Sequence, residues 1–341
     1  MSTGVTVALD AMSGDHGPAV VVRGAVSFYE ATRRGTSDDV RINLVGDRDV
    51  LARHLGRHGA RLPIDITHAP EVIGMDEHPA EALKRKPHSS IAVMAGLQKK
   101  GVAQAMVSPG NTGAMMAASL FALGRLPGIA RPAIAATLPS EKDPTVVLDV
   151  GANVGCRPAQ LKQFAYMGSA YSRGVFGVER PRVSLLNVGS EPTKGTPTLR
   201  EAHRMLAETD LNFTGNIEGD GLLKGEADVV VCDGLEGNIL LKITESIAEL
   251  IGGSLYLEMR RHWFTRAGFL MMKPAFSQLW RSLDSAEYGG APLLGLNGVS
   301  IVAHGSSNAK AICNAIRAAC HFYRSGVNEV IERELGERDQ S

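Results

Sequence analysis

Cysteine is scarce in this sequence, and its few cysteines form no recognisable site. They stand at Cys156, Cys232, Cys313 and Cys320, without the CxxC spacing or the density of a disulfide framework. A reducing compartment therefore suits the chain. Long apolar runs are missing too: none approaches the roughly 18 residues of a transmembrane helix, and the N-terminus turns acidic too early for a signal peptide. We predict a cytoplasmic protein and leave open a peripheral association with the inner face of the cell membrane.

An excess of charge of either sign is also absent. Lys and Arg together number 36, as do Asp and Glu, so the composition gives no indication of a nucleic-acid partner. The sequence has no GxSxG, no GKS/T phosphate loop, no GxGxxG and no HExxH. These absences argue against a serine hydrolase, a P-loop nucleotidase and a nicotinamide enzyme. We expect neither a metal nor an organic cofactor.

The clearest motif that is present runs from Ala103 to Arg125, AQAMVSPGNTGAMMAASLFALGR. A short apolar strand leads into turn-forming residues, and Thr112 is the expected N-cap of a helix that Gly113 opens. A strand, a glycine-containing loop and a helix together aim free backbone N–H groups at an anion. An ordinary turn between a strand and a helix is the alternative. The residues expected to face the anion are Ser108, Gly110, Asn111, Thr112 and Gly113.

The alternation of strand and helix continues along the chain, and it predicts a three-layer αβα sandwich with a mixed, mostly parallel sheet. Residues 133–138 and 145–150 are close enough in sequence to form an antiparallel hairpin within that sheet. Polar residues stand where the predicted strands end, and we expect those ends to converge on one crevice. They are Asp10, Asp15, His16, Asn111, Thr112, Asp149, Asn153, Lys194, Asp233, Asn238, His304, Ser306 and Ser307. For Asp15, helix capping is the alternative.

Residues 239–285 interrupt this alternation with two helical stripes. Apolar residues recur at helical spacing from Ile243 to Trp263 and again from Phe269 to Leu283, which predicts a projecting helical hairpin. We expect the stripes either in a dimer interface or against an anionic membrane or an acyl chain, and both can hold together. The residues expected at the tip are Arg260, Arg261, Trp263, Phe264, Phe269, Leu270 and Met271. The chain is then a single α/β domain, 1–330, that carries this insertion and ends in a charged tail, 331–341.

Seven segments, spread in order over about residues 5–325, resemble the acyl-(acyl carrier protein):phosphate acyltransferase (PlsX) family. They are VALDAMSGDHGP, MDEHPAEALKRKPHSS, VSPGNTGAMMAASLFALGRLPGIARPA, LDVGANV, DGLEGN, AEYGG and AHGSSNAKAICNAIR. The resemblance implies a homodimer whose fold is similar to isocitrate and isopropylmalate dehydrogenases and to phosphotransacetylase. It also implies that inorganic phosphate attacks the thioester of a long-chain acyl carrier protein, in bacterial phospholipid (phosphatidic acid) synthesis. The acyl phosphate would then pass to a membrane-bound glycerol-3-phosphate acyltransferase.

The resemblance also implies roles for particular residues. Lys194 and Asn238 match family positions tied to activity. For this reaction the residues themselves suggest that Lys194 holds the phosphate together with helix N-terminal amides, and that Asn238 or loop N–H groups stabilise the oxyanion. His16 or His304 would protonate the leaving thiolate or bind the phosphate; the alternative is that no acid is needed, because thiolate is a good leaving group. The phosphate-binding or acyl-phosphate-binding residues implied are Asp10, Gly14, Asp15, Ser108, Gly110, Asn111, Thr112, Gly113, Asp149, Asn153, Asp233, Ser306 and Ser307.

A basic cluster at Lys84, Arg85 and Lys86 would be a solvated face in most proteins. In light of the resemblance, the cluster and the hairpin arginines become candidate docking sites for the acidic carrier protein. The chain departs from the family pattern at Ser13, at Gly155-Cys156 and at Glu236. Of these, Glu236 would add an anion near the phosphate.

Two rival functions remain open. A phosphotransacetylase that acts on short acyl-CoA would need no aromatic hairpin, and a non-catalytic acyl-phosphate or lipid sensor could use the same fold. A dehydrogenase on the related fold is disfavoured by the missing nucleotide motifs.

Overall fold

A single sheet runs through the residues that the structure describes. The structure is a computed structural model, and it describes residues 4–31, 39–261, 264–265, 268–269, 271–272 and 287–336. The strands are β1 (Val5–Asp10), β2 (Val40–Gly46), β3 (Ile64–His68), β4 (Ala105–Ser108), β5 (Ala133–Leu138), β6 (Thr145–Leu148), β7 (Val183–Leu186), β8 (Phe213–Ile217), β9 (Val229–Val231), β10 (Ala291–Leu294) and β11 (Val299–Val302). They lie in the order β3-β2-β1-β4-β11-β10-β5-β6-β9-β7-β8.

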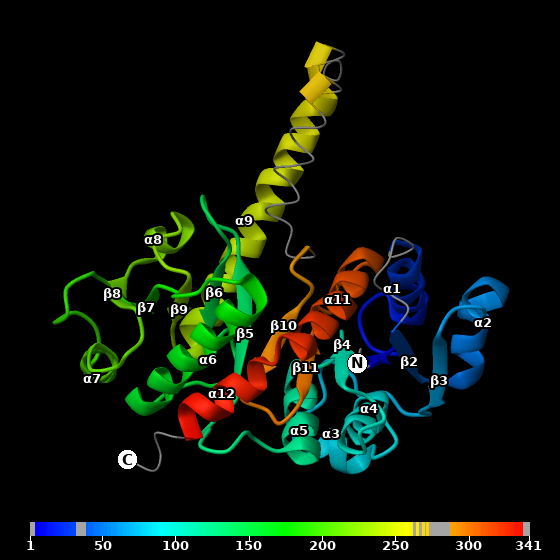
Figure 1. Cartoon of the computed structure of the whole chain (residues 1–341). Helices are drawn as coiled ribbons and strands as arrows, with labels where there is room; N and C mark the ends of the chain where they lie inside the picture. Colours follow the sequence, from blue (N-terminus) through cyan, green and yellow to red (C-terminus); the bar gives the residue numbers. More distant parts are fainter. Residues whose placement is uncertain are drawn as a thin grey trace.

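Helices cover both faces of this sheet (Figure 1). Side chains alternate along β1, where Val7 and Leu9 join one buried cluster and Ala8 joins the other, as the period of a strand requires. The first cluster packs under α1 (Gly17–Ala31), α2 (Arg48–Gly59), α6 (Pro158–Phe176), α7 (Pro197–Ala207), α11 (Ala309–Ser325) and α12 (Val327–Gly336). The second packs under α3 (Pro79–Arg85), α4 (Ser90–Lys99), α5 (Thr112–Leu123), α8 (Gly219–Leu223) and the start of α9 (Gly234–Arg261). The predicted three-layer sandwich is confirmed.

The direction of the strands reverses in the middle of the sheet. β1, β2, β3, β4 and β11 are parallel, and so are β6, β7, β8 and β9. Between these two groups, β11–β10, β10–β5 and β5–β6 are antiparallel pairs. Three successive antiparallel pairs turn the second group opposite to the first. The sheet is therefore mixed and mostly parallel, as predicted, but its strands end at two opposite edges.

We call these the first edge, where β1, β4 and β11 end, and the second edge, where β6, β7 and β9 end. The strands of the two groups run in opposite directions, yet the loops after β6 and β9 line the same pocket as the loops after β4 and β11. The predicted convergence therefore holds for these four loops, although not every polar side chain at a strand end lines the pocket.

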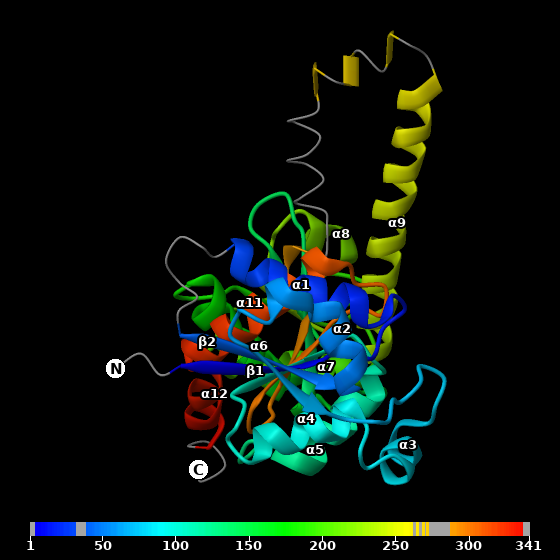
Figure 2. The same cartoon turned by 90° about the vertical axis from the view of Figure 1, so that its right-hand side faces the viewer.

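Helix α9 starts after β9 and extends far beyond the body of the molecule (Figures 1 and 2). It corresponds to the first stem of the predicted hairpin, although it begins at Gly234, earlier than the predicted insertion at 239. The predicted tip residues Trp263 and Leu270 lie outside the described residues, as does the side chain of Arg260.

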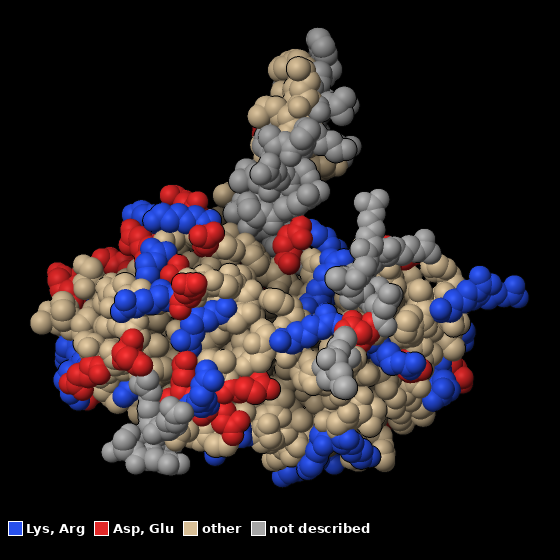
Figure 3. All heavy atoms as spheres, viewed as in Figure 1, with Lys and Arg blue, Asp and Glu red and all other residues tan. Residues whose placement is uncertain are grey.

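Near the C-terminus, part of the predicted charged tail is helical. α12 continues to Gly336, and its Ile331 and Leu335 are buried against the first cluster. These apolar residues, spaced one turn apart, hold the segment to the core, so the structure differs here from the tail predicted from residue 331. Among the described helices, none combines the length and the apolar character needed to cross a membrane. On the face shown in Figure 3, positive and negative side chains are interspersed.

Candidate functional site

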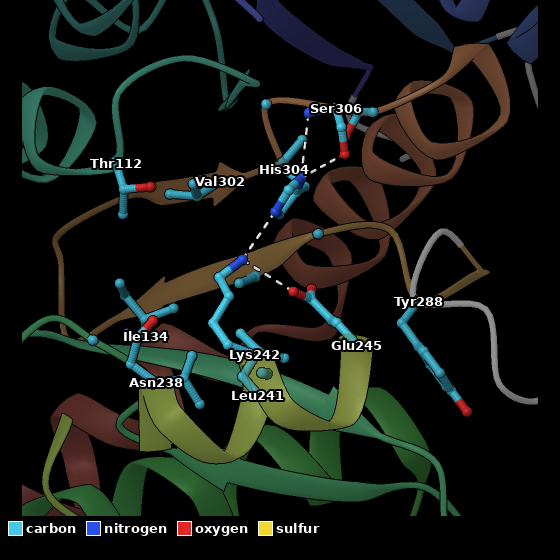
Figure 4. A pocket seen from close by; sticks show the side chains of 18 of the residues that line it. Thr112, Ile134, Asn238, Leu241, Lys242, Glu245, Tyr288, Val302, His304 and Ser306 are labelled. Atoms are coloured by element: carbon cyan, nitrogen blue, oxygen red, sulfur yellow. Dashed lines mark hydrogen bonds and ion pairs between the residues drawn. The ribbon is translucent and has the colours of Figure 1, made fainter. Parts of the chain in front are cut away.

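A pocket of about 780 Å³ lies where the loops after β4 and β11 meet the first turns of α9 (Figure 4). One part of its wall is polar and comes from the loops at the first edge. The other part is apolar and includes Ile134, Ala136, Leu138, Val150, Leu241 and Ala248. The pocket therefore offers an anion and an apolar chain adjoining surfaces.

A series of polar contacts crosses the pocket (Figure 4). Nζ of Lys242 lies 2.9 Å from Nε2 of His304 and 3.0 Å from Oε2 of Glu245. The other ring nitrogen of His304, Nδ1, lies 2.7 Å from Oγ of Ser306. The backbone amide of Ser306 also donates to Nδ1, at 3.2 Å. Both nitrogens of the ring are thus engaged.

Two helices begin at the polar part of the pocket. α5 is capped by Asn111 and α11 by Asn308, and each cap side chain accepts a hydrogen bond from an amide of the first turn. Helix N-termini carry partial positive charge and N–H groups that suit an anion. Thr112 is the first residue of α5 and not its cap, because Asn111 supplies the capping oxygen; the predicted cap was wrong by one residue.

Asn238 reaches the pocket because two glycines let α9 lie directly against the loop after β6. A Cβ at Gly234 would stand 2.3 Å from the carbonyl oxygen of Asn153, and one at Gly237 would stand 1.9 Å from that of Asp149. Both distances are far below contact distance, so only glycine fits. This close approach sets Asn238 on the pocket wall beside Gly151 in the loop after β6.

Seven of the predicted site residues line this pocket. They are Asp15, Gly110, Thr112, Asn238, His304, Ser306 and Ser307. Those at the first edge follow β1, β4 and β11, while Asn238 is carried there by α9. The remaining predicted site residues do not line the pocket.

Several of these remaining residues hold the loops in shape. Asp10 is fully buried and accepts a hydrogen bond from Oγ of Ser108 at 2.7 Å. Nδ2 of Asn111 donates to the carbonyl oxygen of Met75 at 2.9 Å. Three further predicted residues, Gly14, His16 and Gly113, are also absent from the pocket wall, and His16 is exposed.

Asp149 and Asn153 form a buried network at the second edge. Oδ1 of Asp149 accepts from the amide of Ile134 at 2.9 Å, and its Oδ2 accepts from the amide and side chain of Asn153 at 2.7 and 2.9 Å. Burial raises the pKa of the Asp149 carboxyl, against the opposite effect of these hydrogen bonds. The network ties the end of β6 to the start of β5.

Lys194 and Asp233 also lie at the second edge. Lys194 is in the loop after β7, exposed, with Nζ 3.8 Å from Oε1 of Glu191. Two strands, β9 and β6, separate β7 from β5 in the sheet, so the structure does not bring Lys194 to the pocket. The carboxylate of Asp233 accepts from the amides of Cys156 and Leu235.

Glu236 does not face the pocket, contrary to the concern raised by its sequence position. Its carboxylate lies 3.4 Å from the amide of Asp233, while Asp233 in turn caps the first turn of α9 through Leu235. The arrangement is similar to a capping box, except that Asp233 accepts from the second amide of the helix and not from the third. The departure from the family pattern therefore supports the helix start.

The predicted basic cluster is largely paired within the chain. Arg85 and Lys86 both form ion pairs with Glu77, and Lys86 also donates to the carbonyl oxygen of Val72. Lys84 is exposed. At the predicted tip, Arg261 pairs with Glu258, Phe264 and Met271 are exposed, and Phe269 is half-buried.

Comparison with known proteins places the chain in a family. The sequence model of a family described as "Fatty acid synthesis protein" matches residues 5–330. The chain belongs to this family. A relative named "Phosphate acyltransferase" from Pelotomaculum thermopropionicum is 49% identical over 313 residues, 92% of this chain and 90% of that protein. One of the same name from Pelobacter propionicus is 46% identical over 332 residues, 97% and 94% of the two chains. The predicted family is confirmed, and with it the enzyme class, an acyltransferase.

Solved structures give the same architecture. A phosphotransacetylase from Streptococcus pyogenes aligns with a TM-score of 0.64 at 18% identity, over 95% of both chains. The EutD phosphotransacetylase from Staphylococcus aureus aligns with a TM-score of 0.59 at 15% identity, over 94% of both chains. At such identities the likeness concerns the fold alone.

Two residues that line the pocket, Lys242 and Glu245, were not predicted from the sequence. Their signal was present: Asn238, Lys242 and Glu245 follow the spacing of one helix face. Because residues from 239 onward were assigned to a projecting hairpin, this face was not connected to the site.

Proposed function

We propose that this chain transfers the acyl group of a long-chain acyl carrier protein to inorganic phosphate. An oxygen of HPO₄²⁻ forms a bond to the thioester carbonyl carbon, and the carbon–sulfur bond breaks. The hydrogen of the phosphate ends on the thiol sulfur, so the products are acyl phosphate and the free carrier thiol. The observation that carries the proposal is the pocket, in which two helix N-termini and the Lys242–His304 contact adjoin an apolar wall.

Positioning supplies most of what this reaction requires. Phosphate is itself the nucleophile, so no enzyme ester is needed, and holding it against the carbonyl carbon removes the entropic cost of the encounter. The first turns of α5 and α11 suit its charge. Asn238 is an amide donor on the facing wall, where it suits the oxyanion of the tetrahedral intermediate.

The apolar wall favours a long acyl chain over an acetyl group. Strand β5 presents Ile134 and Leu138 to the cavity, and α9 adds Leu241 and Ala248, a surface that a two-carbon group would leave largely uncovered. For the carrier itself, Lys84 and Arg85 are the exposed residues of the basic cluster. The product, an acyl phosphate, suits a membrane-bound glycerol-3-phosphate acyltransferase in phospholipid synthesis.

We also propose one catalytic α/β domain that includes the insertion, and a homodimer. Ile243, Ile247 and Ile251 are each about half exposed, and they form a stripe along α9. At about 100° per residue, this stripe faces away from Asn238 and Lys242. A surface opposite the pocket suits a second copy of the chain, and the exposed apolar residues at the far end of the helix suit transient contact with a membrane.

A phosphotransacetylase acting on short acyl-CoA is the second candidate, favoured by the likeness in fold to such enzymes. A non-catalytic sensor is the third. One assay separates them: purified protein is mixed with palmitoyl-acyl carrier protein and phosphate, and acyl phosphate is trapped with hydroxylamine. We expect a hydroxamate signal that requires phosphate. Activity with acetyl-CoA alone would support the second candidate, and carrier binding without any turnover would support the sensor.

In the same assay we expect Asn238→Ala and Lys194→Ala each to lower turnover by about tenfold or more, the effect typical of losing one transition-state donor. For Asn238 the reason is its place on the pocket wall; for Lys194 it is the resemblance to family positions tied to activity. Asn212→Ala, an amide outside the pocket, is the control. Rates near wild type in both variants, with the fold intact by circular dichroism, would contradict the site assignment.

A further inference from the structure

We infer that Lys242 is the cationic ligand of the attacking phosphate and that His304 is a positioning residue for it. This inference rests on the proposed function, which it deepens by naming the group that recognises phosphate. The first observation is the charge of the residues that line the pocket. Among the described residues that line the pocket, Lys242 is the one Lys or Arg, whereas Asp15, Glu245 and Glu249 contribute carboxylates. Because three carboxylates outnumber one ammonium, the formal charge on this wall is negative even with Lys242. Lys242 is thus the one formal positive charge among these lining residues that can attract a phosphate dianion, and its loss would make the wall more negative still.

The geometry leaves Lys242 able to bind a ligand. An ammonium group has three N–H donors. Two are accounted for by His304 at 2.9 Å and Glu245 at 3.0 Å, and the side chain is half exposed where it borders the cavity. The third donor is therefore available to a phosphate oxygen. Such a charge-assisted hydrogen bond is roughly twice as strong as one between neutral groups.

His304 and Glu245 hold this lysine from two directions. Lys242 is on α9, which comes from the second edge, while His304 follows β11 at the first edge. Their contact thus fixes α9 against the loop that leads into α11. His304 is itself fixed by the 2.7 Å contact of Nδ1 with Ser306. With Nε2 on Lys242 and Nδ1 on Ser306, neither ring nitrogen is free to exchange a proton with substrate, which makes His304 a residue that aims Lys242.

The first experiment measures the phosphate dependence of turnover in Lys242→Met, a neutral side chain of similar length. We expect KM for phosphate to rise by about tenfold or more, with KM for the acyl donor nearly unchanged. Lys242→Arg keeps the charge and is expected to recover most of the affinity. Lys224→Met is the matched control, since Lys224 is an exposed lysine directly after α8 and is paired with Asp220.

Calorimetric titration with inorganic phosphate gives a readout independent of turnover. We expect phosphate binding to be weakened in Lys242→Met and preserved in Lys224→Met. An unchanged phosphate affinity in Lys242→Met, in a folded protein whose wild type is active, would overturn the inference and leave the proposed function standing. If the wild-type protein forms no acyl phosphate with any thioester donor, the proposed function fails, and the inference fails with it.

The role of His304 is tested by two substitutions. The side-chain carbonyl of His304→Gln can still accept from Lys242, so this variant is expected to keep the wild-type pH profile of kcat and most of the phosphate affinity. His304→Ala removes the acceptor and is expected to raise KM for phosphate. If both variants instead lose kcat equally and flatten its pH dependence, His304 exchanges a proton with substrate and is not a positioning residue.

Discussion

At Gly237 the backbone of α9 lies against the carbonyl oxygen of Asp149 more closely than any side chain would allow. An added Cβ would stand 1.9 Å from that oxygen and 2.8 Å from Sγ of Cys232. Cys232 also donates to the same carbonyl oxygen at 3.3 Å, so neither neighbour can move away without disturbing the other. The position of Asn238, the next residue, depends on this packing.

We therefore expect Gly237→Ala to destabilise the fold by about 1–3 kcal/mol, as overpacking of a filled site does, and to lower turnover by displacing Asn238. Urea unfolding and the acyl phosphate assay measure the two effects. Gly253→Ala is the control on the same helix, because a Cβ there meets no atom within 4 Å. Replacing this helical glycine is expected to stabilise the protein by about 0.5–1 kcal/mol. Equal effects of the two variants would contradict the argument.

For single residues, the sequence predicted which residue types stand near the site better than it predicted what each side chain does there. His304 and Ser306 were expected there and do line the pocket, and Asn238 does so as well. Asp10 and Asp149 have the residue type of a site but are fully buried and hydrogen-bonded. A carboxylate after a strand looks the same in a sequence whether it faces a cavity or the loop around it. Only the packing of the loop separates the two.

Among the elements, β7 and β9 are joined by a partly buried ion pair that a change of pH can break. NH2 of Arg182, before β7, lies 2.7 Å from Oδ1 of Asp228, before β9, and Nε lies 3.2 Å from Oδ2. Burial by itself would raise the pKa of the Asp228 carboxyl. The hydrogen bonds from Arg182 outweigh this effect and hold the pKa below its usual range.

A carboxyl whose pKa is lowered in the folded state stabilises the fold above its unfolded value of about 3.9 and loses this contribution as the pH falls through the folded value. We expect Asp228→Asn to cost about 1–2 kcal/mol at pH 7. The difference from wild type should shrink as the pH falls below about 4. Urea unfolding at pH 7, 5 and 3 measures it, with the exposed Asp220→Asn as the control. A difference that stays constant with pH would contradict the linkage.

The alternation of strands and helices could be predicted from local pattern, and so could the hairpin of β5 and β6. What could not be predicted is the direction in which distant strands pair. The reversal depends on β10, which follows residues 239–285 in sequence and yet lies between β5 and β11 in the sheet. No local sequence pattern predicts that β10 pairs between these two strands. As a result, Asp149, Lys194 and Asp233 were expected in one crevice with His304, although their side chains do not line it. The residues that follow Asp149 and Asp233, namely Val150, Gly151 and Gly234, do line it.

For the molecule as a whole, α9 has two different sides. One carries Asn238, Lys242 and Glu245 into the pocket, and the other carries the stripe of Ile243, Ile247 and Ile251. At about 100° per residue, the two sets lie on opposite sides of the helix. The stripe can therefore be covered by a partner without closing the pocket. Beyond it, toward the far end, Phe264 and Met271 are 58% and 86% exposed.

This separation predicts that self-association and membrane contact can be changed independently. Ile243→Asp with Ile247→Asp places two charges on the stripe and is expected to weaken self-association by about tenfold or more, measured by sedimentation equilibrium. Phe269→Glu with Met271→Glu is expected to reduce flotation with anionic vesicles and to leave self-association unchanged.

The control is Val102→Asp with Leu223→Asp, which alters apolar residues of similar exposure elsewhere on the surface. It should change neither measurement. If the stripe variant and this control associate equally, the stripe is not the contact between copies. If the tip variant floats as wild type does, the membrane contact lies elsewhere on the chain. Because the stripe faces away from the pocket, a stripe variant that remains folded should also bind inorganic phosphate as wild type does, and a loss of that binding would mean that the partner helps to form the pocket.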